Sequence, residues 1–138
     1  MFAQVHTPEQ LAPHELDAYL ERGWFRMGQT IFTTNFLHVK NEIYSTIWLR
    51  VFLNEYSAGS TQVKLFKRNA GFQTRVRPAA ITTEKEDLYT VYKASVPFQA
   101  SKSLEHLLFF GRSEADSIYN TYEVTVHDGD KLIACGFF

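Results

Sequence analysis

The sequence contains little cysteine: Cys135 is the only one in 138 residues. A single cysteine excludes an internal disulfide and any metal site built from several cysteine ligands. It lies in the apolar stretch LIACGFF, where we interpret it as a small buried hydrophobic side chain rather than a reactive thiol. Such sparse use of cysteine fits a protein of the reducing cytoplasm.

Long hydrophobic runs are also absent. No run approaches the ~18 apolar residues that indicate a transmembrane helix. The first residues, MFAQVHTPEQ, do not show the charged segment and apolar stretch of a signal peptide. The sequence therefore predicts no membrane partner, and we expect a cytoplasmic protein.

Familiar catalytic and metal-binding spacings are missing as well. The sequence has no GxSxG, Walker A or GxGxxG motif, and its histidines show no HxxxH or HxH spacing. We therefore expect no metal site, and we interpret the pair His127–Asp128 as part of a turn. The five histidines are His6, His14, His38, His106 and His127.

The overall charge is close to neutral. A net charge of −1 and a pI near 6.5 argue against a protein that coats nucleic acid, and we expect no DNA partner. The 45% hydrophobic content is that of a globular chain, and 138 residues make one domain or part of one. Aromatic residues make up 15%, which indicates a ring-rich core or a ring-lined pocket, with the core favoured.

The pattern of apolar and turn-forming residues predicts an α+β protein. The order is one helix, three strands, a helix, and then a β-α-α-β-β block over residues 72–138. We place a domain boundary between residues 71 and 72. The expected helices cover 12–23, 61–69, 81–96 and 101–111, and the expected strands 24–36 (two around Gly28), 44–53, 72–78 and a hairpin at 119–138. Pro13 suits the first turn of its helix and Gly23 the left-handed end, the run from Asn69 to Gly71 should end the second helix, and Asp128-Gly129 should form the hairpin turn.

Three details of this prediction are specific enough to be tested by the structure. The helix at 81–96 should begin with Thr83 as cap and Glu86 three residues later, and its inward stripe should be Leu88, Val91 and Tyr92. The strand at 44–53 should alternate between two faces. The final strand, KLIACGFF, is apolar on both faces and should be a central strand.

The position of that last strand suggests that the chain is a fragment. A terminal carboxylate buried in a central strand would cost several kcal/mol. We therefore expect the rest of the sheet to lie beyond Phe138.

Basic residues gather in one stretch, KLFKRNAGFQTRVRP, at 64–78. On a helix, positions i, i+3 and i+4 share a face, and on a strand alternate residues do. One interpretation is a solvated face that is balanced by nearby acids. The other is a surface for a polyanion, with neighbouring rings available for stacking on bases. The cations are Lys64, Lys67, Arg68, Arg75 and Arg77, and the acids are Glu84, Glu86 and Asp87.

Four segments of the chain resemble the arginyl-tRNA–protein transferase family in their order and spacing. They are LDAYLERGWFRMGQTIFTTNF, KLFKRNAGF, EKEDLYTVYKASV and YNTYEVTVHDGDKLIACGFF, which together extend over nearly the whole chain. The family includes bacterial enzymes that add leucine to proteins beginning with Asp or Glu. The resemblance implies a GNAT-like domain (the acyl-CoA N-acyltransferase fold), incomplete here, after a small α/β N-terminal region that ends at residue 71.

The resemblance also implies the activity and its partners. The reaction would transfer Arg or Leu from charged tRNA to proteins with acidic N-termini, which marks them for degradation by the N-degron pathway. The aminoacyl-tRNA would be a co-substrate, and no further cofactor would be needed. Family members often carry a cysteine cluster where this chain reads TTNFLHVKNEIYSTIWLR, and they continue past LIACG. The cluster's metal role is therefore not expected here.

The resemblance carries over to individual residues. Tyr89 and Tyr92, in the LYxxY helix, become candidate catalytic residues, one of which could align the acceptor, although core packing is the alternative for both. Tyr89 is the preferred candidate because it falls off the inward stripe. Candidate tRNA- or substrate-binding residues are Arg26 in GWFR, Lys67, Arg68 and Asn69 at the basic helix end, and Lys64, Arg75 and Arg77 of the basic stretch.

Two other functions stay open. An acetyl-CoA-dependent N-acetyltransferase of the same fold would need a glycine-rich pyrophosphate loop at a helix start, and none occurs in these residues. A catalytically silent fold that only binds RNA or a protein is the non-enzymatic alternative.

Overall fold

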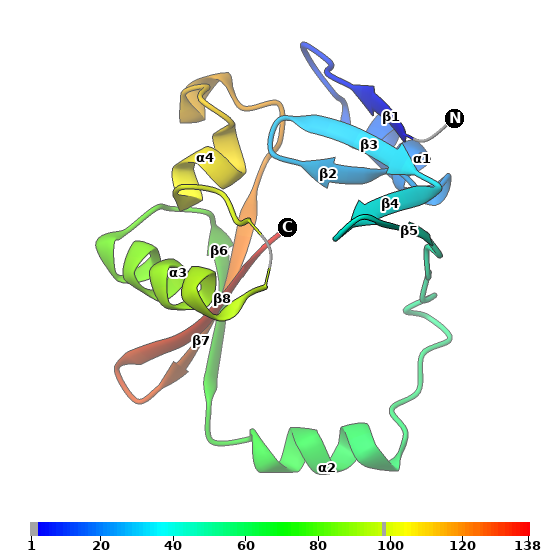
Figure 1. Cartoon of the computed structure of the whole chain (residues 1–138). Helices are drawn as coiled ribbons and strands as arrows, with labels where there is room; N and C mark the ends of the chain where they lie inside the picture. Colours follow the sequence, from blue (N-terminus) through cyan, green and yellow to red (C-terminus); the bar gives the residue numbers. More distant parts are fainter. Residues whose placement is uncertain (1–2, 98) are drawn as a thin grey trace. The chain divides into compact units, whose positions relative to one another are not determined.

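The computed structural model describes residues 3–97 and 99–138, and it confirms an α+β protein with antiparallel sheets (Figure 1). In these ranges the strands are β1 (Ala3–His6), β2 (Phe25–Met27), β3 (Thr30–Thr34), β4 (Phe36–Val39), β5 (Glu42–Ser45), β6 (Gln73–Pro78), β7 (Tyr122–Asp128) and β8 (Lys131–Phe137). The helices are α1 (Pro13–Glu21), α2 (Ser60–Arg68), α3 (Thr83–Ser95), α4 (Leu104–Phe109) and a 3₁₀ turn, η1 (Glu114–Asp116).

The chain folds into two compact units. The first consists of Met1–Arg50 with Glu105–Tyr119, and the second of Val51–Leu104 with Asn120–Phe138. The boundary that we placed between residues 71 and 72 falls inside the second unit. Residues 51–71, including α2, therefore group with the C-terminal sheet.

The first unit contains the sheet β1-β3-β2 and the β4-β5 hairpin. As predicted, Pro13 begins α1 and Gly23 follows its end in the left-handed region, with a φ of +80°. Gly28, in the turn between β2 and β3, also has a positive φ, of +56°. Gln29 is buried, and its side-chain amide donates to the Leu108 carbonyl oxygen at 2.9 Å. This hydrogen bond ties the β2–β3 turn to α4.

The predicted strand at 44–53 is wrong. The strand ends at Ser45, and no strand of the described chain pairs with the residues that follow. Trp48 instead stacks on Phe25 with ring centroids 3.8 Å apart, and its indole Nε1 donates to the Thr34 carbonyl oxygen. An alternating apolar pattern needs a partner strand for its backbone groups, and without one Leu49 is 86% exposed.

The second unit contains the antiparallel sheet β6-β7-β8. The predicted hairpin is confirmed: β7 and β8 are joined by Gly129–Asp130, with Gly129 at φ +58° as a two-residue turn of type II′ requires. Within the described residues β7 is the central strand and β8 lies at the edge of the sheet, so the expected second partner of β8 is not among them. Cys135, on β8, is only half-buried.

Helix α3 is confirmed, but its cap and its inward face differ from the prediction. The cap is Thr82, whose Oγ1 accepts from the Lys85 backbone N–H, so Thr83 is the first helical residue. Val91 is exposed and Tyr92 is half-exposed, whereas Lys85 and Tyr89 are buried. A stripe chosen by apolarity alone missed the buried lysine, because burial of its ammonium depends on a partner from the sheet.

Substitutions at the cap test directly where α3 begins. Replacing Thr82 by alanine should lower the free energy of unfolding by about 1 kcal/mol, because one backbone N–H at the start of α3 loses its acceptor. Replacing Thr83 by alanine should change it by less than about 0.5 kcal/mol. Urea denaturation of the two variants measures both values. Equal losses, or a larger loss for Thr83, would contradict the observed cap.

Candidate functional site

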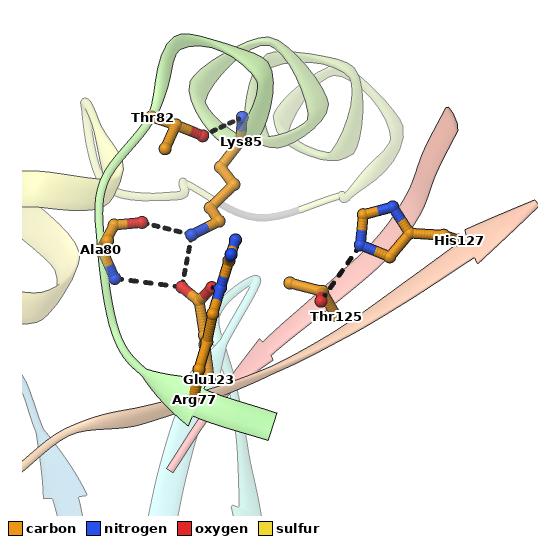
Figure 2. Close-up of polar contacts among 7 residues, drawn as sticks. All are labelled: Arg77, Ala80, Thr82, Lys85, Glu123, Thr125 and His127. Atoms are coloured by element: carbon orange, nitrogen blue, oxygen red, sulfur yellow. Dashed lines mark hydrogen bonds and ion pairs between the residues drawn. The ribbon is translucent and has the colours of Figure 1, made fainter. Parts of the chain in front are cut away.

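A buried cluster of charged side chains lies between α3 and the sheet of the second unit (Figure 2). At its centre is Glu123 on β7, whose side chain is fully buried. Its Oε1 accepts from Arg77 Nε at 2.6 Å, and its Oε2 accepts from the Ala80 N–H at 3.1 Å and from Lys85 Nζ. Two cations therefore converge on one carboxylate.

The strand pattern places these residues together. Alternate residues of β7 share a face, so Glu123, Thr125 and His127 point to the same side of the sheet. The register puts Arg77 directly opposite Glu123 and Arg75 opposite Thr125. The cluster is thus a consequence of the pairing of β6 with β7.

Lys85 completes the cluster from the helix. Its side chain is only 2% exposed, and its ammonium donates both to Glu123 and to the Ala80 carbonyl oxygen. Thr125 is also buried, and its Oγ1 lies 3.2 Å from His127 Nε2. Polar groups are thus buried on the side of the sheet that faces α3, and Val76 on the other side is 63% exposed.

The surroundings of Glu123 keep it ionised. Burial by itself would raise the pKa of this carboxyl, but the hydrogen bonds from Lys85, Arg77 and the Ala80 N–H outweigh burial and hold the pKa below its ordinary value. Burial, and then the negative charge of Glu123, raise the pKa of the Cys135 thiol. A carboxylate that already accepts three hydrogen bonds and has a lowered pKa is a poor general base, so the cluster is suited to binding and positioning.

The lowered pKa of Glu123 predicts a pH dependence of stability. A carboxyl whose pKa is lower in the folded state contributes stability above its unfolded pKa, near 4.5, and loses it as the pH falls through the folded value. The difference in melting temperature between wild type and Glu123→Gln should therefore be constant above about pH 5 and shrink below it. Thermal melts from pH 7 to pH 3 measure it. A difference that stayed constant to pH 3 would contradict this assignment.

The basic residues of α2 form a separate, exposed set. Lys64, Lys67 and Arg68 are exposed, and within the described chain they have no carboxylate partner. Asn69 is the C-terminal cap of α2. Both interpretations of the basic stretch require exposed cations, and on α2 the cations are exposed.

Two of the acids that were expected to balance these cations have other partners. Glu86 accepts from the Leu104 N–H with both carboxylate oxygens, at 3.1 and 3.2 Å. Glu84 accepts from the Leu132 N–H at 3.2 Å. Because these carboxylates bind backbone groups, the positive charge of α2 is not neutralised by them.

The other candidate residues are in different surroundings. Arg26 belongs to the first unit, where its guanidinium lies 4.3 Å from the centre of the Tyr119 ring. Tyr89 is buried and its hydroxyl donates to the Ser101 carbonyl oxygen at 3.0 Å, whereas Tyr92 is 49% exposed. Our preference for Tyr89, which rested on its lying off the inward stripe, is therefore wrong in its premise. Of the two tyrosines, Tyr92 is the accessible one.

Sequence analysis missed Lys85 and Glu123 as members of a site. The sequence carried a signal for Glu123. Its strand and the strand that contains Arg77 were both predicted, and a carboxylate on one strand can pair with an arginine opposite it on a neighbouring strand. Lys85 carried a weaker signal, its position four residues before Tyr89 on one helical face. Neither signal fixes which strands are neighbours.

Comparisons with other proteins add no assignment. Within the described residues, no three His, Cys, Asp or Glu side chains are grouped as a metal site would need, and no helix is long and apolar enough to cross a membrane. Family models, curated proteins and solved structures were compared with the chain, and none matches it. The function is therefore inferred from the residues of the chain itself.

Proposed function

We propose that this protein is an aminoacyl-tRNA–protein transferase that moves Arg or Leu from charged tRNA to proteins with acidic N-termini. The observation that carries the proposal is the set of exposed cations on α2, Lys64, Lys67 and Arg68, which have no carboxylate partner in the described chain. In a chain with a net charge of −1, such a local excess of positive charge favours a polyanion such as tRNA.

The order of elements in the second half of the chain supports the fold that this activity implies. Strand β6 is followed by α3, α4, β7 and β8, and the three strands form an antiparallel sheet in the order β6-β7-β8. A GNAT-like domain begins with such a β-α-α-β-β block. We propose that residues 72–138 are the first half of such a domain.

The proposed reaction needs no energy source besides the tRNA ester. The acceptor's α-amine attacks the ester carbonyl carbon, a C–N bond forms, and the C–O bond to the terminal ribose breaks. The ribose hydroxyl leaves with a proton, and the amine loses one to a base or to water. The protein's task is to align amine and ester and to polarise the carbonyl. Tyr92, with its half-exposed side chain, is the better placed of the two tyrosines to contact the acceptor.

Binding without catalysis is the second candidate. The favouring observation is that the polar atoms of Glu123 and Tyr89 are occupied by hydrogen bonds to their neighbours, which leaves neither free to act as a base. On this alternative the chain would hold tRNA and transfer nothing. The two candidates share the tRNA surface and differ only in the chemistry.

A filter-binding assay tests the shared part of both proposals. Uncharged tRNA should bind. The logarithm of the association constant K should fall linearly with the logarithm of the salt concentration between 50 and 200 mM, because the protein's cationic side chains displace counterions from the phosphates. A single-stranded DNA oligonucleotide of similar length serves as comparison. Absence of tRNA binding at 50 mM salt would overturn both candidates.

A further inference from the structure

The side chain of Arg77 is fixed at one end and free at the other. Its Nε donates to Glu123 Oε1 at 2.6 Å, and half of the side-chain surface is exposed. Among the described residues no acceptor lies within hydrogen-bonding distance of its two terminal nitrogens. The two terminal nitrogens of Arg77 thus remain available as coplanar donors for a ligand, while the hydrogen bond from Nε to Glu123 fixes the orientation of the guanidinium.

The charge around Arg77 favours an anion. Among the described residues, Glu123 is the one carboxylate in contact with Arg77 and Lys85, so the three groups leave one positive charge in excess. Arg75 lies two residues earlier on the same face of β6. Its Nη2 donates to the side-chain oxygen of Gln73, Oε1, rather than to a carboxylate. An arriving anion would therefore meet two guanidinium groups in a cluster that keeps two positive charges in excess, one shared by Arg77 and Lys85 and one on Arg75.

The surroundings of Arg77 favour the carboxylate of a single side chain over the phosphate backbone of tRNA. A guanidinium can bind carboxylates and phosphates alike in a bidentate manner. The Arg77 side chain, however, is half-buried and held beside Glu123, so one small anionic group reaches it more readily than a continuous backbone does. Lys64 and Lys67, on the open surface of α2, are flexible point charges that suit a phosphate backbone instead. The two parts of the basic stretch thus differ in the chemistry that they offer.

We propose that Arg77, positioned by Glu123, binds the acidic side chain at the N-terminus of the acceptor protein, while the α2 cations bind the tRNA. This inference rests on the proposed function for the identity of the acceptor. It makes Arg77 a specificity-determining residue and Glu123 its positioning residue.

The test uses two labelled peptides that differ only in their first residue, Asp or Asn, and measures their binding to the whole protein by fluorescence anisotropy. Wild type should bind the Asp peptide at least about tenfold more tightly. Arg77→Lys should lose that preference, because its one ammonium is taken up by Glu123 and no donor pair remains. Its affinity for tRNA should stay within about twofold of wild type. Urea denaturation of Arg77→Lys confirms that the variant folds.

Each outcome either supports or overturns the assignment of Arg77 to the acidic side chain. Equal binding of the two peptides by wild type overturns the inference without any variant, and so does an Arg77→Lys protein that keeps the preference for Asp. Loss of tRNA affinity in Arg77→Lys, with peptide binding unchanged, would assign Arg77 to phosphate instead. If tRNA does not bind but the preference for Asp depends on Arg77, the proposed function fails while the carboxylate site stands.

Discussion

Replacing Glu123 by alanine is expected to lower the free energy of unfolding by about 3–5 kcal/mol, a loss that only Lys85→Met should match among the single substitutions proposed here. Lys85 has 2% of its side chain exposed, and Glu123 supplies its only negatively charged partner in the described chain. Without that carboxylate a buried ammonium would keep only the Ala80 carbonyl oxygen. Urea denaturation followed by circular dichroism measures the loss.

Paired substitutions separate the charge from the volume of the side chains. Lys85→Met should be as damaging as Glu123→Ala, because it leaves the carboxylate buried with one cation fewer. The double variant Lys85→Met/Glu123→Leu should lose less than either single variant, since no buried charge remains unpaired. Arg77→Gln should cost less than about 1.5 kcal/mol, because half of the Arg77 side chain is exposed. Additive losses in the double variant would contradict the buried ion pair.

Removing two cations from α2 is expected to have the largest effect on tRNA binding. In Lys64→Ala/Lys67→Ala, affinity at 50 mM salt should fall by about tenfold or more, because two phosphate contacts disappear. The slope of log K against log salt should become shallower by about 1.4–1.8. Stability should be almost unchanged, since no residue of α2 is buried. Filter binding across a salt series measures the affinity and the slope together.

A matched variant controls for the loss of charge. Lys102→Ala/Lys131→Ala also removes two positive charges from exposed positions of the second unit. If α2 is the tRNA surface, this control should keep affinity within about twofold of wild type and keep its salt slope. Equal losses in the two double variants would mean that only net charge matters, and α2 would have no special role.

The parts of the fold that the sequence predicted are those set by local chemistry. Pro13 begins α1, Gly23 follows its end in the left-handed region, and Gly129 forms the β7–β8 turn. These residues act through the backbone angles that they allow, which do not depend on distant parts of the chain. Helix α2 followed in the same way from its pattern and from the stop at Asn69.

The parts that the sequence did not predict depend on contacts between distant residues. Residues 46–52 alternate as a strand would, but in the described chain no partner strand is present and Trp48 packs on Phe25 instead. Lys85 is buried only because Glu123, 38 residues away, accepts its ammonium. An apolar stripe on α3 was therefore the wrong basis for choosing its inward face. The basic stretch was found from the sequence, but its division into free α2 cations and an anchored Arg77 was not.

The central claim is the transfer of an amino acid, and one assay tests it directly. Purified protein is incubated with tRNA that carries radiolabelled Arg or Leu and with peptides that begin with Asp, Glu or Ala. The account predicts label in the Asp and Glu peptides, from one of the two charged tRNAs, and none in the Ala peptide. Label in none of the peptides, with tRNA bound, would contradict the transferase and favour a chain that only binds RNA.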